Sequence, residues 1–263
     1  MAGNQKPAVI LGCGYVGRFL YSRGTARGKF LLATTRGVHP CRDELPDSAH
    51  RQFDLSRRET WDHIPQEADL IWCFPAAPLQ LVRQFAERLR ESPCRLVMLG
   101  STSAYDLSNS AGDYPPPWID ESSPLDLTKP RVQGEEYLRK ELGAIVLRVA
   151  GIYGPGRNPL DWIRAGRVGP SRKYVNLVHV EDLADGCLLA LDHGKPGEAY
   201  NVSDGTPRTW DEICRFVHQH CGIDPSTSNA RMENGKRISN GKLSRELGVT
   251  MLHPDLYAEL LHL

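Results

Sequence analysis

Residues 8–17 read AVILGCGYVG: four apolar side chains run into glycines at positions 12, 14 and 17. An apolar run that ends at a glycine is typical of a buried strand of a parallel sheet. Glycines spaced GxGxxG after such a strand, where a helix begins, form the turn that binds dinucleotides. In that turn Gly12 permits the tight turn, Gly14 lets the backbone approach a pyrophosphate, and Gly17 lets the helix pack closely on the strand. A glycine-rich turn without a ligand is the alternative.

The rest of this turn supplies further contacts to a dinucleotide. A helix N-terminus presents unpaired N–H groups and the positive end of the helix dipole, and both favour phosphate. We therefore expect a bound cofactor to contact the whole turn, namely Gly12, Cys13, Gly14, Tyr15, Val16 and Gly17.

Short apolar runs alternate with amphipathic stretches through the first half of the chain, as in βαβ units. The predicted strands after the first are Phe30–Thr34, Gln52–Leu55, Leu70–Phe74, Leu96–Leu99 and Ala144–Val149, and the predicted helices include Leu79–Arg90, Arg131–Glu141, Val180–Leu191 and Trp210–His220. This order predicts an α/β protein with a Rossmann, doubly wound parallel sheet and a smaller C-terminal substrate-binding part. We expect residues 1–149 to form the dinucleotide-binding domain and 150–263 the substrate side, with about 174–202 returning to the first domain.

Composition excludes several classes of function. The 263 residues carry 32 Lys and Arg against 32 Asp and Glu, so the chain has no basic field for nucleic acid or anionic lipid. No apolar run approaches the roughly 20 residues of a membrane helix, and no signal-peptide pattern precedes the glycine turn. The seven cysteines form no CxxC pair, which argues against a metal site or a disulfide framework. We expect a cytoplasmic protein with reduced thiols.

The end of the second predicted strand bears on the type of dinucleotide. An acidic residue about 20 positions after the glycines would bind the ribose 2′-hydroxyl of NAD. Here residues 34–37 read TTRG, and hydroxyls beside an arginine suit a 2′-phosphate. NADP is therefore preferred over NAD, with contacts from Thr35 and Arg36; alternatively, Arg36 is solvated or stacks on adenine. Asp54 and Leu55 are predicted to lie at the adenine, although Asp54 could equally cap the next helix.

Further motifs recur in a fixed order along nearly the whole chain. They are FPAA at 74–77, STSAY at 101–105, LRVAGIYGPG at 147–156, VNLVHVED at 175–182, YNV at 200–202 and RISN at 237–240. With the glycine turn, this series resembles the extended branch of the short-chain dehydrogenase/reductase superfamily, of NAD-dependent epimerase/dehydratase type. The resemblance implies cofactor contacts from Pro75, Ala76, Ala77 and Arg131.

Two departures from the pattern of that family affect its chemistry. Extended members usually space their glycines GxxGxxG, whereas Leu11 stands here at the first of those positions. They also carry Tyr-x-x-x-Lys on the helix after the long loop, where the charge of the lysine lets the tyrosine move a proton. None of the nine tyrosines here has a lysine four residues later. By the family's spacing to Glu135, the tyrosine position holds Leu127 and the lysine position holds Arg131. Arg131 can still reach the cofactor ribose, but a guanidinium does not give up its proton.

Two residues of the STSAY motif are the catalytic candidates. Ser101 occupies the position of the family's catalytic Ser/Thr, four residues before Tyr105. The resemblance implies that the Ser101 hydroxyl hydrogen-bonds the reacting oxygen; a turn serine that satisfies backbone groups is the alternative. Tyr105 could substitute as the acid/base, although in the family this tyrosine mostly packs.

The substrate side is predicted from the same motifs, and its candidate residues are Ser103, Tyr153, Arg157, Asn176 and His179. His179 has a pKa range suited to acid/base work, whereas its neighbours in the motif indicate that it orders the loop. Residues 156–173 also carry Arg164, Arg167, Arg172 and Lys173. Arginines suit phosphate recognition, and a solvated loop is the alternative. The second domain is shorter than in typical sugar-nucleotide epimerases, which argues against a bulky substrate.

Two functions fit these residues. The first is an atypical NAD(P)-dependent oxidoreductase or epimerase-like enzyme that acts on a carbonyl/alcohol carbon, with a sugar or nucleotide-linked molecule among its candidate substrates. Ser101 would position the oxygen, and the proton would come from Tyr105, His179 or water. The second is a catalytically silent NAD(P)-binding sensor. The substrate-side motifs favour the enzyme; its expected partner is a small-molecule substrate, and a homodimer is compatible with the sequence.

Overall fold

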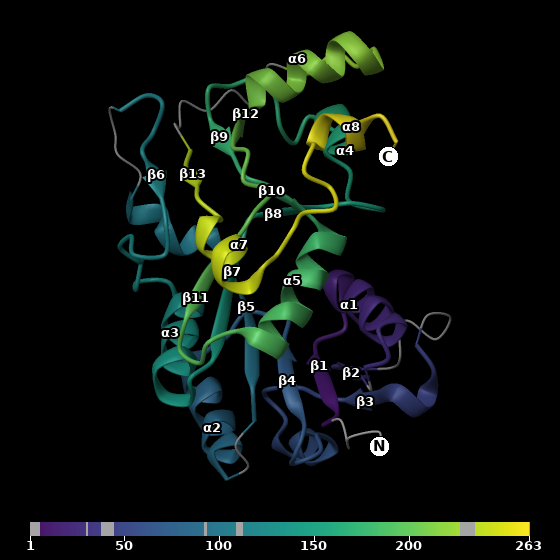
Figure 1. Ribbon diagram of the computed structural model, residues 1–263, viewed down its shortest axis with the longest axis vertical. Coiled ribbons are helices and arrows are strands. Elements are labelled where there is room, and N and C mark those ends of the chain that lie inside the picture. Colours follow the sequence, from purple (N-terminus) through teal and green to yellow (C-terminus); the bar gives the residue numbers. More distant parts are fainter. Residues whose placement is uncertain are drawn as a thin grey trace.

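The computed structural model describes residues 6–29, 31–37, 45–91, 94–108, 113–226 and 235–262. At its centre lies a seven-stranded sheet in the order β11-β7-β5-β4-β1-β2-β3, in which every pair is parallel (Figure 1). Its strands are β1 (Ala8–Leu11), β2 (Leu31–Thr35), β3 (His50–Gln52), β4 (Asp69–Trp72), β5 (Leu96–Ser101), β7 (Ile145–Val149) and β11 (Ala199–Val202). The prediction of a Rossmann, doubly wound parallel sheet is confirmed.

Helices cover both faces of this sheet (Figure 1). The helices α1 (Tyr15–Ala26), α5 (Val180–His193) and α7 (Gly241–Leu247) share one apolar cluster, and η2 (Arg58–His63), α2 (Leu79–Arg90) and α3 (Pro130–Leu142) share another. Side chains of β1 alternate between the two: Ala8 and Ile10 belong to the first cluster, Val9 and Leu11 to the second. The core is therefore two apolar layers, one on each face of the sheet.

Burial on both faces explains why the central strands read as continuous apolar runs. Val9, Ile10 and Leu11 are all 0% exposed. Fully burying a side chain of this size stabilises the fold by about 1.5–3 kcal/mol. The predicted helix Arg131–Glu141 is found as Pro130–Leu142, and it ends at Gly143, whose φ of 64° is the left-handed conformation of a helix C-cap.

A smaller group of elements lies beyond the carboxyl ends of the central strands (Figure 1). It contains β8 (Gly151–Tyr153), β9 (Tyr174–Val175), β10 (Leu177–His179), β12 (Arg208–Thr209), α4 (Pro159–Arg164), α6 (Trp210–Cys221) and α8 (Leu256–Leu260). All of these elements except β12 contribute to a third apolar cluster, which includes Leu160, Ile213 and Leu256. Nearby, β6 (Trp118–Ile119) pairs with β13 (Arg237–Ile238), and η1 (Asp47–Ala49) and η3 (Thr102–Ser108) are short 3-10 helices.

Between these elements the chain returns to the central sheet. Helix α5 packs against α1, and β11 pairs in parallel with β7 at the edge of the sheet. The stretch Ala199–Val202 was not among the predicted strands, because Asn201 interrupts its apolar pattern. Asn201 is nonetheless 0% exposed, since hydrogen bonds satisfy its amide.

One predicted strand is wrong. The third strand is His50–Gln52 and not Gln52–Leu55. The residues that pair with β2 are polar, whereas Phe53 and Leu55 are buried in the core from the loop that follows. The predicted start of the second strand, Phe30, lies outside the described residues. Among the described helices, none is both long and apolar enough to cross a bilayer.

Candidate functional site

The strand order reverses between β1 and β4, and a cavity of about 670 Å³ opens there at the carboxyl ends of the strands. Such a crevice is where ligands bind in open α/β sheets. The predicted cofactor residues that line it are Gly12, Cys13, Gly14, Thr35, Arg36, Asp54, Leu55, Pro75 and Ala77. Phe53, Ser56, Cys73, Phe74, Pro78 and Leu81 complete the wall. We call this space the first cavity.

The glycine turn has the geometry that phosphate binding needs. Gly12 has a φ of +87°, in the left-handed region that favours glycine, and a β-carbon there would lie 2.8 Å from the Phe74 ring. The N–H of Gly12 donates to Thr34 Oγ1 at 3.0 Å, which fixes the turn on β2. Gly14 is the N-cap of α1, and nothing lies within 4 Å of the place its β-carbon would take. Open space therefore faces the first N–H groups of α1.

Three predicted contacts of this turn, Tyr15, Val16 and Gly17, do not line the cavity. A β-carbon on Gly17 would lie 3.0 Å from the Gly12 carbonyl oxygen, so α1 packs closely on the turn. Val16 packs against the core, and the Tyr15 hydroxyl donates to the Pro155 carbonyl at 3.0 Å. These contacts of Tyr15, Val16 and Gly17 hold the turn in place.

The rim of the first cavity carries Thr35, Arg36 and Asp54. Arg36 is exposed there. The Asp54 carboxylate accepts hydrogen bonds from the Ser56 N–H at 2.9 Å and the Ser56 hydroxyl at 2.7 Å. These bonds, with smaller effects from Arg36 and Arg57, hold the pKa of Asp54 below its ordinary value. The helix-capping alternative for Asp54 does not hold, because Arg57 is the N-cap of η2.

Helix α3 fixes the segment after β4. A β-carbon on Gly134 would lie 2.0 Å from the carbonyl oxygen of Ala76, so the helix touches that backbone directly. Ala76 is accordingly buried under α3 and does not line the cavity. Arg131, in the first turn of α3, is half-buried and also lies outside the cavity wall. Within the described parts of the chain, the Arg131 side chain has no hydrogen-bond or ion-pair partner.

A second cavity, of about 510 Å³, lies beyond the ends of β5 and β7. It is lined by Thr102, Asp106, Gly151, Trp162, Lys173, Tyr174, Val175, Asn176, Leu177, Trp210, Gly235 and Lys236. Among the predicted substrate residues, Asn176 belongs to this wall. Its Oδ1 accepts from the Ile238 N–H at 2.9 Å and its Nδ2 donates to the Lys236 carbonyl at 2.8 Å. Asn176 therefore ties the segment around β13 to the cavity.

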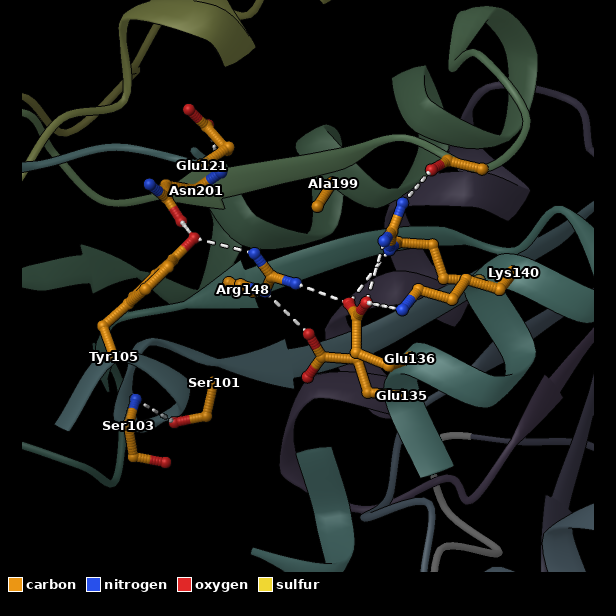
Figure 2. A network of polar contacts seen from close by, with 12 residues as sticks. Ser101, Ser103, Tyr105, Glu121, Glu135, Glu136, Lys140, Arg148, Ala199 and Asn201 are labelled. Carbon is orange, nitrogen blue, oxygen red and sulfur yellow. Dashed lines mark hydrogen bonds and ion pairs between the residues drawn. The ribbon is translucent and has the colours of Figure 1, made fainter. Parts of the chain in front are cut away.

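Ser101 and Ser103 lie where β5 ends, next to Thr102 of the second cavity. The Ser101 Oγ accepts from the Ser103 N–H at 3.2 Å, as a turn serine does (Figure 2). This bond uses a lone pair and leaves the hydroxyl proton of Ser101 available to a substrate oxygen. Both serines are half-buried. The geometry is thus compatible with both the turn role and the positioning role of Ser101.

Tyr105 is directed away from Ser101, into a buried network (Figure 2). Its side chain is 0% exposed. The hydroxyl donates to Asn201 Oδ1 at 2.8 Å and accepts from Arg148 Nη1 at 3.0 Å. Burial raises the pKa of Tyr105 to about 12, although Arg148 opposes this. Tyr105 lines neither cavity, so its position argues against the predicted acid/base role.

Arg148 of β7 is the centre of that network. It is 2% exposed, and it donates to Glu135 at 2.7 Å and to Glu136 at 2.9 Å, both on α3 (Figure 2). Burial raises the pKa of Glu135. Burial also acts to raise the pKa of Glu136, but Arg139 and Arg148 outweigh burial, so the pKa of Glu136 is lowered. Each buried charge has a partner, so the network joins β7 firmly to α3.

Two lysines that no motif indicated lie behind the Ser101–Ser103 turn. The Lys236 ammonium donates to the Thr102 carbonyl at 2.9 Å and to Asp106 Oδ1. The Lys129 ammonium donates to the Ser103 carbonyl at 2.8 Å and to Asp106 Oδ2. Partial burial opposes ionisation of Asp106, but the two lysines outweigh it and lower the pKa of that carboxyl. Because Thr102 and Lys236 are 134 residues apart, sequence spacing gave no signal for this cluster.

Two other predicted substrate residues, Tyr153 and His179, lie outside the second cavity. Tyr153 is 0% exposed, and within the described chain its hydroxyl has no hydrogen-bond partner. His179 is the N-cap of α5, where its Nδ1 accepts from the Glu181 N–H at 3.4 Å. Burial and the neighbouring His253 lower the pKa of His179. His179 thus orders the start of α5, and neither residue lines the second cavity.

The His253 ring lies against the His179 ring, with 3.7 Å between the centroids and 37° between the ring planes. Its Nε2 lies 3.3 Å from Glu181 Oε2, and its Nδ1 lies 2.9 Å from Glu259 Oε1. His179, His253 and Glu259 each place a potential ligand atom within 4.8 Å of the others. The ion pairs of His253 account for this grouping.

The basic residues of 156–173 are mostly directed elsewhere. Arg157 lies over the Tyr15 ring, 5.3 Å from its centroid, beside the glycine turn and not in the second cavity. Arg172 lies over the Tyr114 ring at 3.7 Å, and Arg164 pairs with Asp161 at 3.2 Å. Lys173 is the member of this group that lines the second cavity.

Residues 8–203 match the family described as NAD dependent epimerase/dehydratase. The chain is 26% identical to Protein YeeZ of Escherichia coli K12 over 95% of its own length and 97% of that protein.

Solved structures share the fold. A protein from Methylobacillus flagellatus, named for the same epimerase/dehydratase family, is 25% identical with a TM-score of 0.77, and 98% of each chain is covered. MoeE5, solved in complex with UDP-glucose and NAD, is 18% identical with a TM-score of 0.77, over 97% of this chain and 96% of that one. At 18% identity the second likeness concerns the fold alone.

Proposed function

The chain belongs to the NAD dependent epimerase/dehydratase family, and we propose that it is an NAD(P)-dependent oxidoreductase or epimerase-like enzyme acting on a carbonyl/alcohol carbon of a small molecule. The observation that carries this proposal is the position of two cavities at one edge of the sheet. The first, of about 670 Å³, contains the glycine turn, and the second, of about 510 Å³, contains Thr102 at the end of β5. A dinucleotide in the first and a substrate in the second would meet beside Ser101.

The residues of the first cavity suit a nicotinamide dinucleotide. The open space at Gly14 and the N-terminus of α1 suit the pyrophosphate. Phe53, Leu55 and Leu81 offer an apolar wall to an adenine ring. When bound, such a cofactor would supply or take up hydride at the substrate carbon. The chain would then hold the cofactor, position the oxygen through Ser101 and move a proton.

The rim of the first cavity favours NADP over NAD. Strand β2 ends at Thr35, and the exposed Arg36 follows it on the cavity wall. A guanidinium beside a hydroxyl suits a 2′-phosphate, because charge-assisted hydrogen bonds to phosphate are among the strong ones.

The second cavity suits a polar molecule that carries a ring. Trp162, Tyr174 and Trp210 offer flat apolar surfaces, while Lys173 and Asn176 offer polar groups. Its volume of about 510 Å³ lies within the usual range for small-molecule pockets. A sugar or a nucleotide-linked sugar belongs to this class, and MoeE5, of the same fold, is known in complex with UDP-glucose.

A catalytically silent NAD(P)-binding sensor is the second candidate. The observation that favours it is Leu127, which stands at the family's tyrosine position and is 53% exposed. Tyr105 does not replace that tyrosine, because it is fully buried. A sensor would need the first cavity but no proton donor.

Substitution of Gly14 tests whether the first cavity binds a nicotinamide dinucleotide. Gly14→Asp would place a negative charge before the N-terminus of α1, where we expect the pyrophosphate. The side chain meets no atom there, and aspartate is a good N-cap, so the fold should persist while calorimetric titration shows NADH and NADPH binding lost. Gly14→Asn is the matched control for size, and it should bind more tightly than Gly14→Asp. Equal affinity of Gly14→Asp and wild type would refute the site.

A hydride-transfer assay tests whether the protein is an enzyme or a sensor. Purified full-length protein is mixed with NADH or NADPH and a panel of aldehydes, ketones and keto sugars, and oxidation of the cofactor is followed by its absorbance. Turnover that disappears in Gly14→Asp supports the enzyme. Tight cofactor binding without turnover, in both directions of the reaction, supports the sensor.

A further inference from the structure

The reaction needs a proton at the substrate oxygen, and the residues expected to supply it do not. Leu127 has no ionisable group, and Arg131 keeps its proton. Tyr105 and His179 are buried away from the second cavity. Among the described residues, the cluster of Lys129, Asp106 and Lys236 places ionisable groups directly against the Ser101–Ser103 turn.

In this cluster one carboxylate holds two ammonium groups. The two oxygens of Asp106 each accept from one lysine, and each lysine also donates to a backbone carbonyl of the turn. Every one of these contacts is charge-assisted, so the positions of both ammonium groups are well defined. The cluster carries a net charge of +1, which stabilises negative charge that develops on a substrate oxygen.

Of the two ammonium groups in this cluster, that of Lys236 is the one a substrate can reach. Lys236, Asp106 and Thr102 all line the second cavity, whereas Lys129 does not. An ammonium group has three hydrogens, and within the described chain two of those on Lys236 have acceptors, Thr102 and Asp106. The third hydrogen is available to a ligand in the cavity.

The surroundings of Lys236 also make its proton easier to remove. Burial lowers the pKa of Lys236, and the charges of Lys129 and Lys173 act in the same direction, while Asp106 opposes them. The net direction is downward, so Lys236 gives up its proton more readily than an ordinary lysine.

We propose that Lys236 is the catalytic acid/base of this active site, with Asp106 and Lys129 as positioning residues. This inference rests on the proposed hydride transfer. In the direction of reduction, bound NAD(P)H would supply the hydride that forms the C–H bond at the carbonyl carbon, and it would itself be oxidised to NAD(P)⁺. The π electrons of the carbonyl pass to its oxygen, which forms an O–H bond with a proton of Lys236. Lys236 becomes a neutral amine and regains its proton from water, and oxidation reverses each step.

Lys236→Arg separates proton transfer from charge. The variant keeps a cation beside Asp106, but a guanidinium does not release its proton. With a carbonyl substrate from the panel, turnover should fall by about 10²–10⁴-fold, while the NADPH Kd stays unchanged. The alkaline limb of the kcat profile, where wild-type Lys236 loses its proton, should disappear. Asp106→Asn should move that limb to lower pH, because loss of the carboxylate favours the neutral amine.

Lys242 offers a matched control. It donates to Glu198 at 2.5 Å and to the Ala199 carbonyl at 2.9 Å, and its side chain is 18% exposed against 14% for Lys236. Lys242→Arg should keep wild-type turnover and pH profile. Should Lys236→Arg fold poorly, Lys236→Gln replaces it, with the same expected loss.

Two failures can be told apart. Wild-type turnover and pH profile in Lys236→Arg would overturn the role of Lys236 and leave the proposed function standing. A wild-type protein that binds NADPH but transfers no hydride in either direction would overturn the proposed enzyme and this role together.

Discussion

Gly134 of α3 lies so close to Ala76 that a β-carbon at position 134 would be 2.0 Å from the Ala76 carbonyl oxygen. This contact joins two parts of the site. Ala76 belongs to the segment after β4 whose neighbours Pro75 and Ala77 line the first cavity. Helix α3 carries Arg131, Glu135 and Glu136, and thus the buried contacts to β7. The absence of a side chain at position 134 lets α3 pack against the segment after β4 and also hold its buried contacts to β7.

Gly134→Ala should therefore both destabilise the protein and weaken cofactor binding. The added methyl meets backbone, which cannot rotate away, so the free energy of unfolding should fall by about 1–3 kcal/mol. Gly186→Ala in α5 is the control, because no atom lies within 4 Å of its β-carbon; it should stabilise by about 0.5–1 kcal/mol. Urea unfolding and NADPH titration measure both effects. Equal free energies of unfolding for Gly134→Ala and Gly186→Ala would contradict this prediction, because α3 could then move away from Ala76 without destabilising the protein.

Arg36→Ala tests the preference for NADP. A charge-assisted contact to the 2′-phosphate contributes about 1.5–3 kcal/mol, which is about tenfold or more in affinity. The Kd of NADPH should rise accordingly, while that of NADH changes little. Arg58→Ala is a suitable control, because Arg58 lies over the Trp61 ring and outside the cavity wall. An equal rise in the Kd of NADPH and of NADH would contradict the preference for NADP.

The sheet could be predicted from the sequence because its central strands are apolar on both faces. Val9 and Leu11 face one helical layer and Ile10 the other, so the whole run had to be buried. The same expectation, that a strand reads as an apolar run, predicted β3 at the wrong residues. Phe53 and Leu55 are buried from a loop, whereas the paired residues His50–Gln52 are polar and lie near the edge of the sheet.

The first cavity was more predictable than the second, since it is built from turns that directly follow β1, β2 and β4. The direction of a side chain was not predictable. Tyr105 stands in the expected motif, yet it is directed toward Asn201, 96 residues further along. Lys236 approaches Thr102 from 134 residues away, and no local pattern encodes such a contact.

Tyr105→Phe should lower stability and leave catalysis unchanged. It removes the hydroxyl that satisfies Asn201 and one bond of Arg148, and unsatisfied buried polar groups cost about 1–3 kcal/mol. Tyr153→Phe is the matched control, because the Tyr153 hydroxyl is buried without a partner in the described chain; its removal should cost nothing. A large loss of turnover in Tyr105→Phe at unchanged stability would restore the acid/base hypothesis for this residue.

His253 should stabilise the fold in a pH-dependent way. Burial lowers the pKa of His253, but Glu259 and Glu181 outweigh burial and the pKa in the folded state is raised above 6.5. A raised folded pKa means that this stabilisation is fully present below the unfolded pKa and is lost as pH rises through the folded pKa.

His253→Gln should thus reduce the free energy of unfolding more at pH 5.5 than at pH 9, as measured by urea unfolding. His179 faces the same ring, and its lowered pKa acts with the opposite sign, opposing stability at low pH. His218→Gln is the control, because the exposed pair of His218 with Asp224 contributes little at any pH. A His253→Gln effect that is independent of pH would contradict the assignment of His253 as an imidazolium.

Leu127→Tyr combined with Arg131→Lys rebuilds the pair that the family usually has. The two positions are four apart, and Leu127 is 53% exposed, so a phenol fits there without displacing core. In the Lys236→Arg background, where the proposed donor is missing, the pair should recover about 10²-fold in turnover, the lower end of what a placed acid/base contributes. Leu127→Phe with Arg131→Lys supplies the same ring and charge but no proton. If that variant recovers turnover equally, the gain comes from packing and not from proton transfer.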